Sequence, residues 1–303
     1  MFRSKTENAR FLIVALAFGW GFNWVASRII LEWLPPWMTR SLSIGLGAAI
    51  LVLSALCARK RLTLSKQQVA HVTVAASLNI FIFNVCSAYA QIFGTTGRAV
   101  VIAYSMPIWA AFLARFTLRE SLDRLQFLAL GLCLTGLATL IVPQVRLGFP
   151  LGALFALGCA WAWAGGTVYL KWAKIEADAL VVTAWQLLIG FSALAVGMFV
   201  AEGLPQLNHL PLKVYGWIAY SGLIGFGLCY FLWFVVVDRL SAITASLGTL
   251  LVPMIGVVAA LLVLGEIPTP NDVIGFGLIF AAAVCVLMRT EPKTHAIAIE
   301  IPE

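Results

Sequence analysis

The strongest constraint in this sequence is a succession of long apolar stretches separated by short polar segments. Each stretch has close to the 20 or so residues that an α-helix needs to cross the hydrocarbon core of a bilayer. The 303-residue chain is 62% hydrophobic and only 11% charged, whereas soluble domains are roughly one quarter charged. We therefore predict an all-α membrane protein with ten transmembrane helices, near residues 11–31, 37–57, 69–91, 97–116, 124–142, 149–170, 179–200, 213–236, 242–264 and 271–288.

The basic residues predict the orientation of these helices. A net charge of +7 would suggest a nucleic-acid partner in a soluble chain, but cytoplasmic loops of membrane proteins are also rich in lysine and arginine. If the N-terminus is cytoplasmic, most of the 20 basic residues fall on that side. We therefore expect a multi-pass protein of the cell (inner or plasma) membrane, with both termini in the cytoplasm and no nucleic-acid partner. The basic residues expected on the outer side are Arg28, Arg40, Arg98, Arg146 and Lys213.

An internal repeat relates two of the apolar stretches. Residues 97–120 and 243–266 each have a proline at the eleventh position, Pro107 and Pro253, and a glutamate at the end. A proline inside a helix removes one backbone donor and clashes with the preceding turn. We therefore expect helix kinks at both prolines. Gly/Pro-interrupted spans at matching positions of two halves also point to the binding site of a transporter.

The repeat predicts an inverted architecture. Each copy contains five helices, and because five is odd the second copy must cross the membrane in the opposite sense. We divide the chain into a first repeat at 1–145, a second at 146–290 and a cytoplasmic C-terminal tail at 291–303. The first helix of each repeat matches more loosely, with Trp20 aligned to Trp163. Two halves that exchange roles give one state open to each side, which is the physical basis of alternating access.

Several segments resemble the EamA family of the drug/metabolite transporter (DMT) superfamily. They are WGFNWVASR at 20–28, WAWAGGTVYLK at 161–171, AYAQIFGTTGRAVVIAYSMPIW at 88–109 and the two proline-containing stretches. The resemblance covers about residues 11–290. It implies ten helices, a central cavity lined by both halves, and no cofactor. The family exports amino acids, other metabolites or toxic cations, so the resemblance implies a transporter without specifying its solute.

Polar and aromatic side chains inside the apolar stretches are the candidate solute-binding residues. An amide within a membrane is costly unless it meets a partner helix or a wet cavity, and aromatic rings can stack on planar or cationic solutes. Hydrogen bonding between helices, interfacial anchoring and packing are the structural alternatives for each of them. The candidate substrate-binding residues are Trp20, Asn23, Asn84, Ser87, Arg98, Ser105, Trp163 and Tyr230.

Acidic residues are missing from the middle of every predicted span. A membrane-embedded hydrolase or a metal-dependent enzyme would need carboxylates or metal ligands there, and a proton-coupled cation exporter would need an acidic site. Glu120 and Glu266 end their apolar stretches, and we interpret both as helix-end residues. A glycine-rich phosphate loop is also missing, which excludes direct use of ATP. We expect no enzyme activity, no metal and no cofactor.

The sequence therefore predicts a secondary transporter that exports small amphipathic metabolites, with amino acids as leading candidates, by alternating access. Its partners are then a small-molecule solute and the lipid bilayer, and it is either a monomer or a homodimer. Efflux of toxic planar cations or drugs is the alternative within the same class. An integral-membrane lipid-modifying enzyme and a non-transporting scaffold are the alternatives from other classes.

Overall fold

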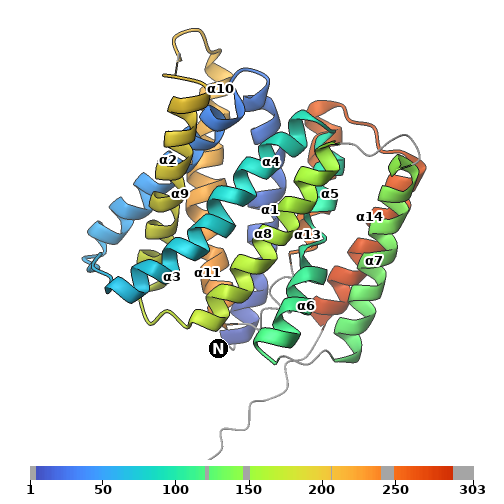
Figure 1. Cartoon of the computed structure of the whole chain (residues 1–303). Coiled ribbons are helices and arrows are strands. Elements are labelled where there is room, and N and C mark those ends of the chain that lie inside the picture. Colours follow the sequence, from blue (N-terminus) through green and yellow to red (C-terminus); the bar gives the residue numbers. More distant parts are fainter. Residues whose placement is uncertain (1–4, 120–122, 146–150, 206, 240–248, 289–303) are drawn as a thin grey trace, which may run out of the picture.

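The computed structural model describes residues 5–119, 123–145, 151–205, 207–239 and 249–288, and these fold into a bundle of helices (Figure 1). In chain order its helices are α1 (Lys5–Leu31), α2 (Pro36–Cys57), α3 (Lys66–Ala76), η1 (Ser77–Ile82), α4 (Phe83–Ile92), α5 (Thr96–Ala103), α6 (Met106–Thr117), α7 (Arg124–Val145), α8 (Leu151–Ala173), α9 (Ala179–Ala201), α10 (Leu212–Tyr220), η2 (Ser221–Leu228), α11 (Cys229–Arg239), α13 (Leu251–Ala259), η3 (Ala260–Leu264) and α14 (Pro270–Met288). The labels η1 to η3 denote π-helical segments.

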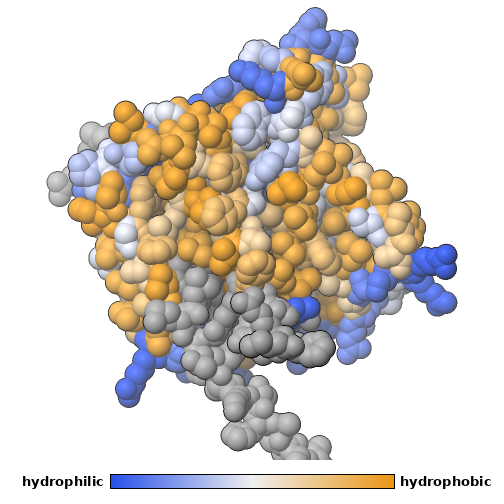
Figure 2. Space-filling view, turned by 180° about the vertical axis from the view of Figure 1, so that it is seen from behind, coloured by the Kyte–Doolittle hydropathy of each residue, from blue (hydrophilic) through white to orange (hydrophobic). Residues whose placement is uncertain are grey.

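Eight helical stretches of the described residues are long and apolar enough to cross a membrane. Two shorter apolar helices, Leu251–Leu264 and Pro270–Ala282, lie in the regions expected to hold the last two spans. Residues 240–248, where the ninth span was expected to begin, lie outside the described residues, as does Glu120. Figure 2 shows apolar side chains over the middle of one face of the bundle and hydrophilic ones towards its two ends.

Corresponding helices of the two halves begin with the same capping arrangement. Before α7, the Asp123 carboxylate accepts a hydrogen bond from the Gln126 backbone N–H at 2.8 Å, and the Gln126 side chain accepts one from the Asp123 N–H at 3.1 Å. Thr269 and Asp272 make the same reciprocal pair before α14. Such capping boxes satisfy backbone donors that a helix start leaves free. These residues lie 146 positions apart along the chain, so the local signal for the helix start is repeated.

Helices α2 and α9 pack side by side in opposite directions. At one end, Lys60 forms a 2.7 Å ion pair with Asp178, and its hydrogen bond lowers the pKa of that carboxyl below the usual value. At the other end, the Glu202 carboxylate accepts hydrogen bonds from the backbone N–H groups of Trp37 (2.9 Å) and Met38 (2.7 Å). A carboxylate is favourable there because the first turn of a helix presents free N–H groups. We call the Glu202 end the upper end, as it lies in Figure 1, and the Lys60 end the lower end.

The two proline-containing segments each start a helix after a turn. Helix α5 ends at Ala103, Tyr104 and Ser105 form a turn, and Pro107 is the second residue of α6. Thr249 and Leu250 likewise form a turn, and α13 begins directly after it, so that Pro253 is the third residue of α13. Proline fits these positions because the first turn of a helix does not need its N–H.

The π-helical segments η1 and η2 interrupt the third and eighth of the expected spans. Each contacts the first helix of the other half at a glycine. The side chain of Asn79 in η1 packs directly on Gly166 of α8, and Asn23 of α1 packs directly on Gly225 in η2. The third and eighth spans were expected to be uninterrupted α-helices. Such π-helical turns often occur beside functional residues.

Candidate functional site

A small chamber lies in the centre of the bundle and is lined by side chains from both halves of the chain. The space open to the centre of a water-sized sphere is about 30 Å³, which is room for one or two water molecules. Except for the partly buried Phe83, every lining residue is buried. The lining residues are Trp20, Asn23, Trp24, Ser27, Arg40, Phe83, Asn84, Ser87, Tyr104, Met106, Trp163, Phe226 and Tyr230.

Aromatic rings form one wall of the chamber. The ring centroids of Trp20 and Trp163 lie 5.1 Å apart in an edge-to-face arrangement, and Tyr230 lies 5.5 Å from Trp20 and 5.8 Å from Trp163. The indole N–H of Trp20 donates to the Gly225 carbonyl at 3.0 Å. The buried indole N–H of Trp163 has no protein partner, so it remains available to a solute or to water.

Amide and hydroxyl groups form a second wall. The Asn84 amide donates to the Ile80 carbonyl at 2.7 Å and approaches the Tyr230 hydroxyl at 3.4 Å. The Ser87 hydroxyl donates back to the Asn84 carbonyl at 3.0 Å. On the facing helix α1, the buried side-chain oxygen of Asn23 accepts no hydrogen bond. The chamber thus offers a free acceptor at Asn23 and a free donor at Trp163.

Arg40 is the charged group of the chamber lining, and the sequence analysis did not propose it as a site residue. It projects from the second turn of α2 and is only 4% exposed. One of its terminal nitrogens donates to the Gln91 side-chain oxygen at 3.3 Å, while its Nε has no partner. Neither of the two ion pairs found among the described residues involves Arg40. Its guanidinium is therefore buried without a carboxylate partner in the part of the chain that the structure describes.

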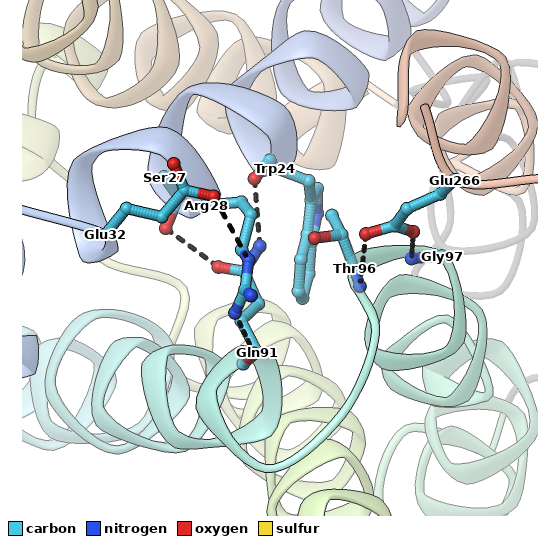
Figure 3. Close-up of polar contacts among 8 residues, drawn as sticks. All are labelled: Trp24, Ser27, Arg28, Glu32, Gln91, Thr96, Gly97 and Glu266. Atoms are coloured by element: carbon cyan, nitrogen blue, oxygen red, sulfur yellow. Dashed lines mark hydrogen bonds and ion pairs between the residues drawn. The ribbon is translucent and has the colours of Figure 1, made fainter. Parts of the chain in front are cut away.

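Gln91 closes the chamber at the upper end (Figure 3). Its side-chain nitrogen donates to the Trp24 carbonyl at 2.9 Å, and its side-chain oxygen accepts a hydrogen bond from the Ser27 hydroxyl at 2.8 Å. Arg28 donates to the Gln91 backbone carbonyl at 2.7 Å and lies 4.0 Å from Glu32. These contacts fasten the end of α4 to the end of α1. We call this group of side chains the upper closure.

Glu266 lies beside the upper closure and caps another helix (Figure 3). Its carboxylate oxygens accept hydrogen bonds from the backbone N–H groups of Thr96 (3.1 Å) and Gly97 (3.0 Å) at the start of α5. The expectation of a helix-end role for Glu266 thus matches its contacts, although the helix it caps lies in the other half of the chain. The position of Glu120, for which the same role was expected, lies outside the described residues.

The structure brings together most of the predicted site residues and separates two of them. Arg98 lines a different hollow at the upper end, next to Glu266. Ser105 is buried and accepts a hydrogen bond from the Trp109 indole at 3.3 Å, outside the chamber lining. The remaining candidates, all of which line the chamber, are Trp20, Asn23, Asn84, Ser87, Trp163 and Tyr230.

Several chamber residues were not proposed from the sequence. Trp24 and Ser27 are not among these, because the 3.6-residue periodicity of the sequence already places both on the helix face of Trp20 and Asn23. Tyr104 comes from the turn before Pro107, so the proline marked the correct region of the chain, although neither predicted kink residue lines the chamber itself. The others are Arg40, Phe83, Met106 and Phe226.

A larger hollow lies at the lower end, between α8, α9 and α11. Its volume is about 550 Å³, and its lining includes Leu170 and Phe234. Leu170 lies two turns beyond Trp163 on one face of α8, or about 10 Å along the helix, and Phe234 lies one turn, about 6 Å, beyond Tyr230 on α11. The hollow therefore continues the chamber's two helix faces towards the lower end.

The chain is similar to known transporters of one family. The model of the EamA-like transporter family matches the chain twice, at residues 8–142 and 150–288. The uncharacterized transporter YoaV of Bacillus subtilis (strain 168) is 27% identical over 271 residues, which cover 88% of this chain and 92% of YoaV. A protein of Salmonella typhimurium (strain LT2) named probable amino-acid metabolite efflux pump is 24% identical, and the match covers 89% of this chain and 92% of that protein. A protein of the same name in Escherichia coli (strain K12) is 23% identical, and the match covers 94% of this chain and 93% of that protein.

A solved structure supports the fold. A crystal structure described only as that of a protein superimposes with a TM-score of 0.72 at 19% identity, covering 92% of this chain and 97% of the other. At this identity the likeness concerns the fold alone. Together with the two family matches, it indicates a two-repeat helical membrane transporter architecture.

Proposed function

The chain belongs to the EamA-like transporter family, and from this we propose that it is a secondary transporter that exports small amphipathic metabolites, with amino acids as the leading candidates. The observation that carries the proposal is the buried central chamber, to which both halves contribute polar and aromatic side chains. Polar groups inside a membrane protein are costly and typically mark a solute pathway. The two relatives named amino-acid metabolite efflux pumps support the choice of solute.

We propose alternating access by an inverted 5+5 repeat of ten spans. A residue that contacts its own symmetry mate must lie close to the symmetry axis. Trp20 contacts Trp163, to which it corresponds with a shift of 143, and Asn84 contacts Tyr230, to which it corresponds with a shift of 146. The antiparallel packing of α2 on α9 also supports opposite orientations of the two halves. The proposed axis passes through the chamber.

The two ends of the chamber support one particular state of this cycle. Gln91 ties α4 to α1 above the chamber, while the hollow of about 550 Å³ lies below it. We propose that the upper end faces the exterior and the lower end the cytoplasm, as the distribution of lysine and arginine predicts. The structure then corresponds to a state closed to the outside, and both termini are cytoplasmic in the cell membrane.

Efflux of planar cations is the second candidate, and the aromatic wall of Trp20, Trp163 and Tyr230 favours it. Aromatic faces attract cations. Arg40 opposes it, because a buried guanidinium in the same chamber repels a cationic solute and the lining described above contains no carboxylate. We therefore favour metabolites that carry an anionic group in addition to an apolar or aromatic part.

Counterflow in proteoliposomes tests the proposal. Vesicles preloaded with an unlabelled amino acid should accumulate the labelled form transiently, and empty vesicles should not. A panel of amino acids and related metabolites without any counterflow would count against the proposal. Growth under stress from planar cations separates the two candidates, because expression of the chain should protect cells only if cations are exported.

A further inference from the structure

We propose that Arg40 binds the anionic group of the solute, so that the chamber selects molecules with a free carboxylate. This inference rests on the proposed transport function and goes beyond it by naming the recognised chemical group and the residue that recognises it. The sequence placed Arg40 on the outer side of the membrane, near the start of the predicted span 37–57, and in the structure it lines the chamber.

The Arg40 guanidinium is buried and incompletely hydrogen-bonded. Arginine has five N–H donors in a planar fork, and Arg40 uses one of them, in a 3.3 Å bond to the neutral Gln91 side chain. Its Nε is buried without a partner. Burying a charge is costly unless it is paired and hydrogen-bonded. The Arg40 guanidinium is buried and charged, and no carboxylate of the described residues pairs with it. A solute anion that enters the chamber can therefore bind it.

The shape of the guanidinium also matches that of a carboxylate. A carboxylate binds arginine most strongly when its two oxygens face two parallel N–H groups. The free Nε and a neighbouring terminal nitrogen of Arg40 form one such pair. The 3.3 Å bond to Gln91 lies at the long end for an N–H···O hydrogen bond, so a charged acceptor can replace it at little cost.

In this structure the chamber has room for one or two water molecules, so a solute enters it only in a wider state, and the rest of its lining then complements an anionic head group. The aromatic wall of Trp20, Trp163 and Tyr230 suits an apolar side chain, and the free Asn23 oxygen accepts a hydrogen bond from an amino or hydroxyl group. A neutral α-amino acid carries all three features. A carboxylic acid without the amino group carries two of them, and a primary amine without the carboxylate loses the group that Arg40 recognises.

Solute binding at Arg40 is also expected to weaken the upper closure. The Gln91 side-chain oxygen accepts hydrogen bonds from both Ser27 and Arg40. A solute carboxylate competes with that oxygen for Arg40 and thereby removes one of the contacts that hold α2 against α4. Occupancy of the chamber and the strength of the upper closure are thus linked through one side chain.

A series of matched compounds on the unmodified protein provides the test. L-phenylalanine, L-leucine and L-threonine are each compared with their primary amides and with the amines that lack the carboxylate, by thermal shift of the purified protein and by competition in counterflow. We expect each amino acid to bind about tenfold or more tightly than its amide, as the loss of a charged hydrogen-bond partner implies. Equal binding of acids and amides would overturn the inference.

Variants identify the residue responsible. In Arg40→Gln the amino acids should fall to the affinity of the amides, while the amides change little; Arg40→Lys should keep part of the preference, since it retains the charge without the fork. Arg98→Gln is the matched control, because this arginine lies in a separate hollow. An unchanged preference in a well-folded Arg40→Gln protein would refute the role of Arg40. If that variant does not fold, the compound series still decides.

The outcomes also separate this inference from the proposed function. Counterflow of amino acids with equal competition by amides leaves the transport function standing and removes the role of Arg40. Binding that prefers the acids, without counterflow of any of them, keeps the anion site and removes the transport function.

Discussion

Gly166 and Gly225 mark two close approaches between the two halves of the chain. A Cβ added at Gly166 would collide with the side-chain amide of Asn79, and one at Gly225 with that of Asn23. Asn23 corresponds to Gly166 with a shift of 143, and Asn79 to Gly225 with a shift of 146. Each contact therefore pairs an asparagine of the first half with a glycine of the second. The pseudo-symmetry maps one contact onto the other, and it places a glycine where the first has an asparagine and an asparagine where the first has a glycine.

This packing makes a prediction for two adjacent glycines. Gly166→Ala should lower the melting temperature of the purified protein, because overpacking a close contact costs about 1–3 kcal/mol, more than the roughly 1 kcal/mol that alanine gains in a helix. Gly165→Ala is the control, since its added carbon meets Leu78 at an ordinary 3.8 Å. Thermal unfolding of both variants in the same detergent checks the prediction. A Gly166→Ala protein as stable as Gly165→Ala would show that η1 and α8 are not closely packed.

Asn84 provides a prediction for transport. Its amide contacts the Tyr230 hydroxyl across the chamber and lies on the Ser87 side of the wall. We expect Asn84→Ala, like Trp163→Ala, to insert in the membrane normally and to lose most of the counterflow, because each change removes a chamber surface rather than a surface in contact with lipid. Unchanged flux in both variants would remove the chamber assignment.

Chamber-lining side chains that repeat at helical spacing could be predicted from the sequence. Those that tertiary contacts bring to the chamber could not. Trp20, Asn23, Asn84 and Ser87 lie on polar faces of single helices, where periodicity identifies them. Arg40 lies near the start of its helix, where a long basic side chain normally reaches the interface. Its burial depends on Gln91 and on the fit of α4 against α2, which no local pattern encodes.

At the scale of elements, most helix positions follow from apolar length, whereas the π-helical segments do not. The spans of the described residues were predicted to within a few residues because hydrophobic length and bounding charges set them. Segment η1 contains no proline or glycine, and the three glycines of η2 (Gly222, Gly225 and Gly227) do not by themselves specify a π-helix. Their wider turns are stable because each rests on a glycine contact with the opposite half, so their cause is non-local.

Carboxylates that cap helices in the opposite half are the second element-level feature. Glu266→Ala should destabilise the protein by about 1 kcal/mol, since it removes two hydrogen bonds from the start of α5. Its effect on solute affinity should be small, because Glu266 does not line the chamber. Glu32→Ala is the matched control, as Glu32 makes a single long contact of 4.0 Å at the surface. Equal melting temperatures for the two variants would contradict the capping role.

At the scale of the whole molecule, the account depends on opposite orientations of the two halves. The loops that follow α2 and α9 occupy corresponding positions, so inversion places them on opposite sides of the membrane. Single cysteines at the exposed positions Thr63 and Asn208, in a variant without the native cysteines, should react with an impermeant thiol reagent from the cytoplasm and from the exterior respectively. Labelling of both from one side would exclude the inverted repeat.

The central claim is that the chamber opens alternately to the two sides around a bound solute. Labelling of a Ser87→Cys variant without the native cysteines, in right-side-out and inside-out vesicles, tests this most directly, because Ser87 lines the chamber. Ala129→Cys is the buried control outside the chamber. The account predicts labelling of the residue 87 thiol from both sides, at rates that a transported amino acid lowers, and no labelling of the control. Labelling from one side alone, or rates that no solute changes, would contradict it.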